Sequence, residues 1–410
     1  MFSWRVFYFI GNCVRRTHKL KCGEAAFLLD REGKMEFIKG MDISSLIEEE
    51  ACGAKYFDHG EAGDALEILK RYGANYVRLR LWNDPYAEDG RPYGAGTNDL
   101  AKTITLAKRA KALGMGVLLD IHYSDFWADP GKQNVPKAWR GFSADELTQA
   151  VYDFTVEVME KLREADVTPD MVQVGNEITN GLLWPSGKKP NFDEIATYVS
   201  AGIRGVRAVD DRIPVMIHLD NGGFHSMYVE WFDNYIRRGE DFEIIGLSYY
   251  PFWHGTLEEL SYNMKDMAAR YGKKIAVAEV SMGFSMEDYR RYEVPGAVDQ
   301  KEVTEWIRQN LKGKATRSEL VEKLTYPMTP SGQADFMQDV MERIAEVEGG
   351  LGFFYWEPAW IPVPGCGWAT EAALEYTGEK GPGGNEWANQ ALFDYEGNAL
   401  PALERIRDFR

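Results

Sequence analysis

Cysteine is scarce in this sequence. Four cysteines occur among 410 residues, namely Cys13, Cys22, Cys52 and Cys366. They form no CxxC pair and no zinc-finger spacing, so the sequence indicates neither a disulfide framework nor a structural metal site. A GxGxxG turn is also missing, which weighs against a dinucleotide-binding sheet. No apolar run approaches the length of a membrane span.

Basic charge is in short supply as well. The chain has 47 Lys and Arg against 64 Asp and Glu, a formal net charge of −17. Nucleic acids and anionic membrane surfaces attract basic patches, so this balance argues against both as partners and permits a neutral substrate. The 12 tryptophans are, by contrast, many for this length. They fit either core packing or flat surfaces for the apolar faces of sugar rings.

The N-terminal stretch shows no pattern that ties it to a core. Its short apolar patch, Val6–Ile10, has only Arg5 before it and no small-residue cleavage site after it, which makes a poor signal peptide. We therefore expect residues 1–34 to form a tail outside the fold and residues 35–410 to form one catalytic domain. The weak export signal favours a cytoplasmic location, with an extracellular one as the alternative.

From Glu36 onward, short apolar runs alternate with amphipathic stretches. The runs are continuous, as expected of parallel strands covered on both faces. The predicted strands are Glu36–Met41, Tyr76–Leu81, Gly116–Ile121, Met171–Gly175, Val215–Leu219, Ile244–Ser248, Ile275–Ala278 and Gly352–Tyr355. The predicted helices are Asp64–Tyr72, Leu100–Leu113, Ala144–Glu164, Phe192–Val209, Ser226–Arg237, Leu257–Tyr271 and Ser331–Val347.

Eight strands separated by helices predict an α/β protein with a single (β/α)8 barrel. The segment Ser285–Pro330, between predicted strands seven and eight, is longer than a barrel loop needs. We expect it to form an enlarged loop with added helices, in which apolar side chains such as Trp306 pack against the neighbouring loops.

Carboxylates follow two of the predicted strands. Glu177 ends strand four in "MVQVGNE", and Glu279 ends strand seven in "AVAE". Active groups of barrels collect at these C-terminal strand ends. Two carboxylates across a cleft are what glycoside hydrolysis needs, because one protonates the leaving oxygen and the other attacks or activates water. Glu279 could instead form a salt bridge with Arg78 or Arg80, which would also keep a nucleophile ionised.

Longer motifs carry a family resemblance. The chain contains "KGMDISSLIEEE", "YVRLRLWNDPY", "HYSDFWADPGKQNVPKAW", "VQVGNEITNGLLWP", "GLSYYPFWHG", "GLGFFYWEPAWIP" and "WANQALFDYEGN". Over roughly Glu36 to Pro401 it resembles glycoside hydrolase family 53, the endo-β-1,4-galactanases. The resemblance implies retaining hydrolysis of β-1,4-galactan, which forms side chains of type I arabinogalactan and pectin.

The resemblance also implies roles for single residues. Glu177 falls on the acid/base and Glu279 on the nucleophile, while Asn176 should hold the sugar 2-hydroxyl and Arg78 should orient the nucleophile. Three further positions match rim or platform residues of the superfamily: His122, Tyr250 and Trp356. For four other tryptophans a sugar contact and a packing role fit equally well: Trp82, Trp127, Trp253 and Trp360.

The family's calcium site is the point where the resemblance fails. Many bacterial relatives follow the strand-seven glutamate with a loop rich in Asp and His that helps to bind calcium. Here the stretch reads "SMGFSMEDYRRYEVPG", and Ala388 stands where a second ligand is expected. Calcium requires several converging oxygen ligands. We therefore expect no metal and no other cofactor.

This expectation can be tested by chelation. A ligand that binds only the native state raises its stability by mass action. Without a calcium site, the Tm in excess EDTA and the Tm in millimolar calcium should agree within about 2 °C in thermal unfolding. A shift of many degrees would reveal a metal site with other ligands.

Two alternatives stay open at this point. A related two-glutamate barrel could act on β-1,4-mannan or β-glucan, since spacing alone does not reveal which hydroxyl geometry the site accepts. A non-catalytic sugar-binding barrel is the alternative from another class. The intact pair of Glu177 and Glu279 beside His122 and Tyr250 favours an enzyme, because a binding module has no need of a buried acid.

Overall fold

The computed structural model describes residues 36–287, 289, 321–379 and 383–410. The predicted N-terminal tail lies outside the described residues. So does most of the long segment between the last two predicted strands, including Trp306. The structural predictions for these two parts stay predictions.

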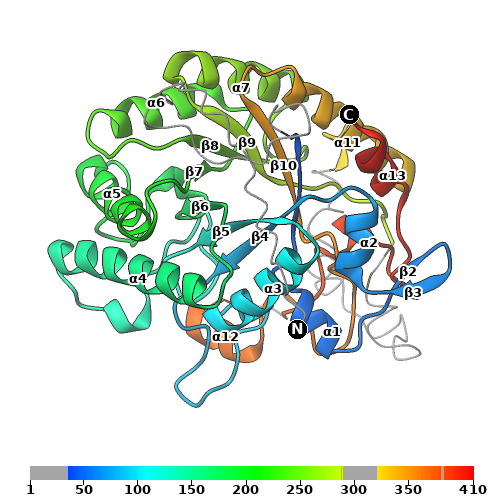
Figure 1. Cartoon of the computed structure of the whole chain (residues 1–410), viewed down its shortest axis with the longest axis horizontal. Helices are drawn as coiled ribbons and strands as arrows, with labels where there is room; N and C mark the ends of the chain where they lie inside the picture. Colours follow the sequence, from blue (N-terminus) through cyan, green and yellow to red (C-terminus); the bar gives the residue numbers. More distant parts are fainter. Residues whose placement is uncertain (1–35, 288, 290–320, 380–382) are drawn as a thin grey trace, which may run out of the picture.

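Eight parallel strands close into a barrel in the order β1-β10-β9-β8-β7-β6-β5-β4. Figure 1 shows the helices α4 to α7 as an outer layer around these strands. The strands are β1 (Ile38–Asp42), β4 (Tyr76–Leu81), β5 (Gly116–Ile121), β6 (Met171–Val174), β7 (Val215–Leu219), β8 (Ile244–Tyr249), β9 (Lys274–Val280) and β10 (Gly350–Trp356). The predicted (β/α)8 barrel is confirmed, and each strand ends within two residues of its predicted bounds.

The predicted helices are also found, again within two residues of their predicted bounds. They are α2 (Ala65–Arg71), α3 (Leu100–Ala112), α4 (Ala144–Glu164), α5 (Phe192–Val209), α6 (His225–Ile236), α7 (Leu257–Tyr271) and α11 (Pro330–Ala345). Local signals explain these bounds. At α4, for example, the Ser143 side chain caps the first turn and Glu146 closes the reciprocal bond of a capping box.

The sequence analysis did not predict several short helices and strands. The structure adds α1 (Leu46–Ala51), a hairpin of β2 (Tyr56–Asp58) and β3 (Glu61–Gly63), α12 (Glu371–Thr377) and α13 (Pro401–Asp408). Elements of three to eight residues are too short for a helical or strand period to stand out. They lie in the loops that flank the barrel.

The barrel interior changes from apolar to polar along each strand. Side chains two positions apart point to the same face of a strand. On β6 the buried pair is Met171 and then Gln173, and on β7 it is Met216 and then His218. The apolar residues belong to one cluster inside the barrel. The polar ones lie at its C-terminal end, where buried charged groups from several strands meet.

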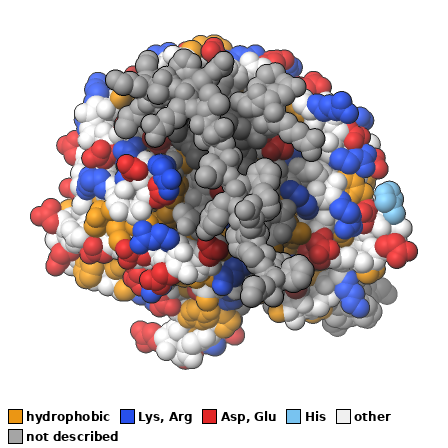
Figure 2. Space-filling model, viewed as in Figure 1, with side chains coloured by type: hydrophobic (Ala, Val, Ile, Leu, Met, Phe, Trp, Pro, Cys, Tyr) orange, Lys and Arg blue, Asp and Glu red, His pale blue; other side chains and the backbone are white. Residues whose placement is uncertain are grey.

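On the face seen in Figure 2, acidic and basic side chains are interspersed among the described residues. Among the helices that the structure describes, none has both the length and the apolar character that crossing a bilayer requires.

Candidate active site

Glu177 stands at the tip of β6, where the chain turns into the short 3-10 helix Ile178–Asn180. Its backbone is left-handed, with φ of 47°, a conformation that costs energy for a residue with a side chain. Its side chain is buried, and the Ser248 hydroxyl donates a 2.5 Å hydrogen bond to Oε1. Burial raises the pKa of Glu177 well above its ordinary value, and nearby Glu279 and Asp220 raise it further. The side chain therefore favours the protonated form of a general acid.

Glu279, in β9, has a different environment. The Arg78 guanidinium lies 2.9 Å from Oε1, and the Tyr250 hydroxyl donates a 2.7 Å hydrogen bond to Oε2. Burial raises the pKa of Glu279, whereas Arg78 and Tyr250 oppose this rise by stabilising the carboxylate. Of the two glutamates, Glu279 is the one that carries the negative charge, as a nucleophile must.

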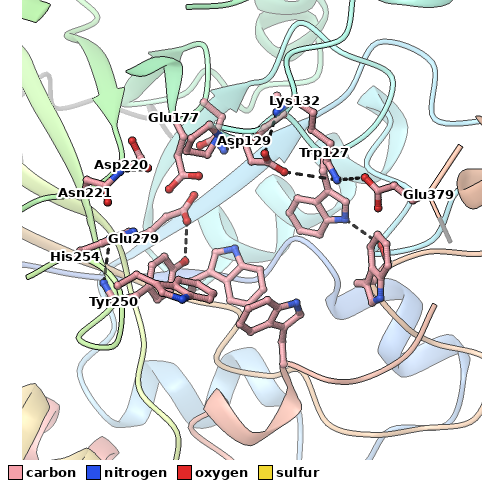
Figure 3. Close-up of a pocket in the computed structure, with 17 residues that line it drawn as sticks. Trp127, Asp129, Lys132, Glu177, Asp220, Asn221, Tyr250, His254, Glu279 and Glu379 are labelled. Carbon is pink, nitrogen blue, oxygen red and sulfur yellow. Dashed lines mark hydrogen bonds and ion pairs between the residues drawn. The ribbon is translucent and has the colours of Figure 1, made fainter. Parts of the chain in front are cut away.

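The two carboxyl groups face each other in Figure 3. One oxygen of Glu177, one oxygen of Glu279 and one ring nitrogen of His218 all lie within 4.8 Å of one another. Carboxyl groups about 5–5.5 Å apart belong to retaining glycosidases, and inverting enzymes need about 6.5–9.5 Å. The same three atoms could approach a metal ion, but the Arg78 cation already occupies one side of Glu279 and would repel it.

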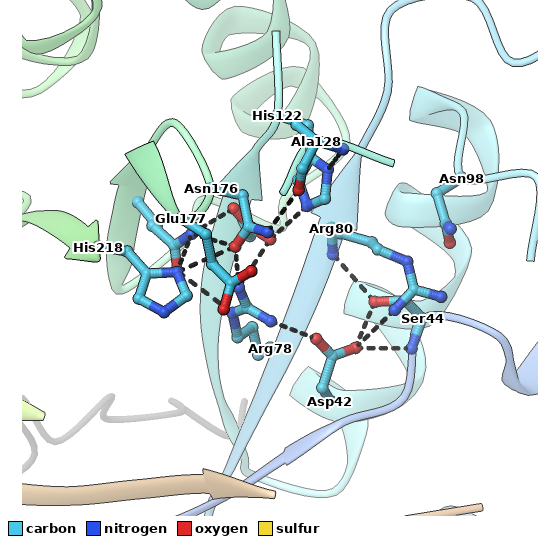
Figure 4. A network of polar contacts seen from close by, with 12 residues as sticks. Asp42, Ser44, Arg78, Arg80, Asn98, His122, Ala128, Asn176, Glu177 and His218 are labelled. Atoms are coloured by element: carbon cyan, nitrogen blue, oxygen red, sulfur yellow. Dashed lines mark hydrogen bonds and ion pairs between the residues drawn. The ribbon is translucent and has the colours of Figure 1, made fainter. Parts of the chain in front are cut away.

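Arg78 lies at the centre of the buried network beneath this pair. Its guanidinium contacts Asp42 at 2.7 Å and Asp120 at 2.9 Å, and donates to Asn176 Oδ1 at 2.8 Å. Asn176 donates in turn to the Ala128 carbonyl, as Figure 4 shows. The amide is thus held in one orientation next to Glu177.

Comparison of the sequence with known protein families agrees with this geometry. Residues 38–406 match the sequence profile of Glycosyl hydrolase family 53. The chain belongs to glycosyl hydrolase family 53.

Several relatives align with nearly the whole length of this chain. An endo-beta-1,4-galactanase from Bacillus subtilis (strain 168) is 39% identical over 402 residues, covering 93% of this chain and 88% of that protein. The Ignisphaera aggregans GH53 catalytic domain is 39% identical, with a TM-score of 0.80 over 93% of this chain and 99% of that one. A fungal beta-1,4-galactanase structure is 32% identical, with a TM-score of 0.70 over 90% and 98% of the two chains. The protein is therefore a glycoside hydrolase.

In this family 53 enzyme, a cavity of about 590 Å³ opens above the two glutamates. Besides the two glutamates, polar side chains and aromatic rings line this cavity. Charged and amide groups come from the loops: Asp129, Lys132, Asp220, Asn221 and Glu379. Flat aromatic surfaces come from Tyr250, Trp127, Trp253, Trp356, Trp368 and Trp387. A cavity walled by indole rings with a few polar groups suits the alternating apolar and hydroxyl faces of a sugar chain.

The predicted tryptophans divide into two groups. Trp127, Trp253 and Trp356 line the cavity. Trp82 and Trp360 are almost fully buried and do not line it. Each of these two packs behind a lining ring, with ring centres 5.3 Å apart for Trp82 and Trp127, and 5.8 Å for Trp360 and Trp356. For Trp82 and Trp360 the structure thus favours the packing role over a sugar contact.

His122 and Arg78 also lie below the cavity rather than in its wall. His122 is buried, with Nε2 2.9 Å from Asp120 and Nδ1 accepting a 3.1 Å hydrogen bond from the Trp82 indole. These residues can reach a sugar only through their neighbours. Trp82 therefore orients His122 as well as backing the aromatic wall.

Sequence reasoning missed several lining residues. Asp220 and Asn221 follow β7 directly, so the strand-end rule that identified Glu177 also pointed to them. Trp368 and Trp387 lie in irregular chain after β10, where no periodic signal shows which way a side chain points. Only the folded loops bring these two rings to the cavity.

Proposed function

We propose that this enzyme cleaves internal β-1,4-galactosidic bonds in galactan chains, such as those of type I arabinogalactan, with retention of configuration. Glu177 is the acid/base and Glu279 the nucleophile. The observation that carries this proposal is the contrast between the two facing carboxyl groups. Glu279 is paired with Arg78 and Tyr250, whereas Glu177 has no cation beside its carboxyl among the described residues.

The contrast supports a double displacement. In the first step a Glu279 oxygen attacks C1 of the sugar, Glu177 gives its proton to the glycosidic oxygen, and the bond from C1 to that oxygen breaks. In the second step the Glu177 carboxylate takes a proton from water, whose oxygen attacks C1 and releases Glu279. Two inversions at C1 restore the original configuration.

Asn176, Tyr250 and Trp356 support the transition state in this proposal. The Asn176 amide is held by Arg78 and the Ala128 carbonyl, which leaves it pre-oriented for the sugar 2-hydroxyl. Trp356 offers its ring as a platform under the sugar at the cleavage point. Trp127 and Trp253 extend this aromatic surface to neighbouring sugars.

The substrate follows from relatives and not from the two glutamates, which many β-glycosidases share. Relatives across bacteria and fungi bear the names endo-beta-1,4-galactanase and arabinogalactan endo-beta-1,4-galactanase. A β-1,4-galactan is a neutral polysaccharide, in keeping with the acidic chain.

The test is sugar release from galactan, β-1,4-mannan and cellulose, with product sizes followed over time. We expect release from galactan alone, with mixed oligosaccharides early in the reaction. Proton NMR of fresh product should show the β-anomer before mutarotation. The α-anomer first would contradict retention, and faster release from mannan would replace galactan as the substrate.

A further inference from the structure

Glu177 has a buried partner that the double displacement does not by itself require. Ser248, near the end of β8, donates its hydroxyl proton to Glu177 Oε1 at 2.5 Å. The oxygen of that hydroxyl, Ser248 Oγ, lies 2.8 Å from His218 Nε2, on β7. Ser248 and His218 are both fully buried, so water does not compete for these contacts.

Ser248 donates to Glu177 Oε1, and this bond fixes the direction of the others. A serine hydroxyl has one proton, so Ser248 Oγ accepts from His218 Nε2 while it donates to the glutamate. Burial lowers the pKa of His218 well below its ordinary value, helped by Arg78, so the ring is neutral. Its Nδ1 then carries no proton and accepts from Gln173 Nε2 at 3.1 Å. Nδ1 also lies 2.9 Å from Asn176 Oδ1, which accepts from the Arg78 guanidinium.

The two oxygens of the Glu177 carboxyl are therefore not equivalent. Oε1 receives the Ser248 proton, which is the hydrogen bond found for this carboxyl group among the described residues. A carboxyl group that accepts a bond at one oxygen carries its own proton on the other. Glu177 lines the cavity, so the other oxygen is the one available to a glycosidic oxygen.

We infer that Ser248 is a positioning residue for the acid/base: its hydroxyl, oriented by His218, fixes Oε1 as an acceptor and keeps the transferable proton on Oε2. This inference rests on the proposed roles of Glu177 and Glu279. After the proton has left, the same hydroxyl stabilises the Glu177 carboxylate, which must then act as the base.

Other groups also set the charge state of Glu177, and a test must leave them intact. Glu279 faces it from β9 and His218 from β7, while Asp220 lies directly after β7 and Asp129 in the loop after β5. Replacing Ser248 with alanine removes one hydroxyl and none of these groups.

The experiment compares the wild type with Ser248→Ala on aryl β-galactobiosides whose leaving groups differ in pKa. A leaving group such as dinitrophenolate departs without a proton, whereas a phenolate of high pKa needs the acid. We expect kcat/KM of Ser248→Ala to fall about 10- to 100-fold for the poor leaving groups and less than about threefold for dinitrophenolate. The alkaline limb of kcat/KM should move to higher pH, because the lost hydrogen bond had favoured the ionised form.

Two further variants separate positioning from a general loss of structure. Ser248→Thr keeps the hydroxyl and should retain most of the wild-type leaving-group dependence. Ser200→Ala removes a buried serine hydroxyl of α5, which accepts from the Glu240 amide far from the cavity. It should change neither the leaving-group dependence nor the pH profile.

An equal loss for every leaving group in Ser248→Ala, with an unchanged alkaline limb, would overturn the inference. Failure of the proposed substrate would look different. If the wild type cleaves aryl mannosides or glucosides instead, galactan is wrong as the substrate, and the same series built on the accepted sugar still decides the role of Ser248.

Discussion

Replacing Glu279 with glycine is expected to lower kcat on galactan by about 10⁴-fold or more, because it removes the group that bonds to C1. The vacated space can admit a small anion. Added azide should then restore cleavage of an activated aryl galactobioside by attacking C1 directly. A single attack inverts the configuration, so the product should be the α-galactosyl azide.

The Glu177→Gly variant should respond differently to azide. An aryl substrate with a good leaving group still forms the glycosyl-enzyme, but water lacks its general base in the second step. Azide needs no base and attacks the glycosyl-enzyme, so the product of two inversions should be the β-galactosyl azide. The anomer of the azide, read by NMR, thus assigns each glutamate.

An exposed glutamate provides the control. Glu375 pairs with Arg91 at the surface, and Glu375→Gly should keep near wild-type kcat with no azide effect. If Glu177→Gly gave the α-azide, or if either active-site variant kept most of its turnover, the assignment of the pair would be wrong.

Replacing Arg78 with methionine is expected to have the largest effect on stability. The side chain is 1% exposed, and its guanidinium contacts Asp42, Asp120 and Glu279, each within 2.9 Å. Removing one partner of a buried ion pair leaves uncompensated charge and costs about 3–5 kcal/mol of unfolding free energy. For a domain of this size we expect the Tm to fall by roughly 4–6 °C.

The same substitution should change the pH profile. Arg78 opposes the rise in the pKa of Glu279, so its loss should raise that pKa further. The nucleophile then becomes protonated at a higher pH, and the acid limb of the kcat/KM profile should move to higher pH. A profile measured on the folded fraction, below the Tm of the variant, separates this effect from unfolding.

Arg109 is a matched control on the outer surface of the barrel. It contacts Glu50 and Asp64, both at 2.7 Å, but its side chain is 27% exposed. Solvent screens such pairs, so Arg109→Met should cost about 1 kcal/mol or less and leave the pH profile unchanged. Equal Tm losses in the two arginine variants would contradict the central role of Arg78.

The barrel and the positions of the two glutamates could be predicted from the sequence alone. Parallel strands covered on both faces are continuously apolar, so a strand such as Val215–Leu219 can be recognised from its sequence without a structure. Because the C-terminal ends of barrel strands meet at one face, a carboxylate directly after such a run, as at Glu177, is placed by the strand itself.

The surroundings of the two glutamates could not be predicted in this way, because they depend on how distant segments pack in the folded chain. Trp82 and Trp356 both follow or end a strand, yet one is buried behind the aromatic wall and the other lines the cavity. Trp368 also lines the cavity, although it lies in a loop with no periodic sequence pattern. Ser248 contacts Glu177, 71 positions away in the chain, because β8 and β6 lie on either side of β7 in the closed barrel. Contacts of this kind depend on the closure of the barrel and on the packing of loops, which local sequence periods do not encode.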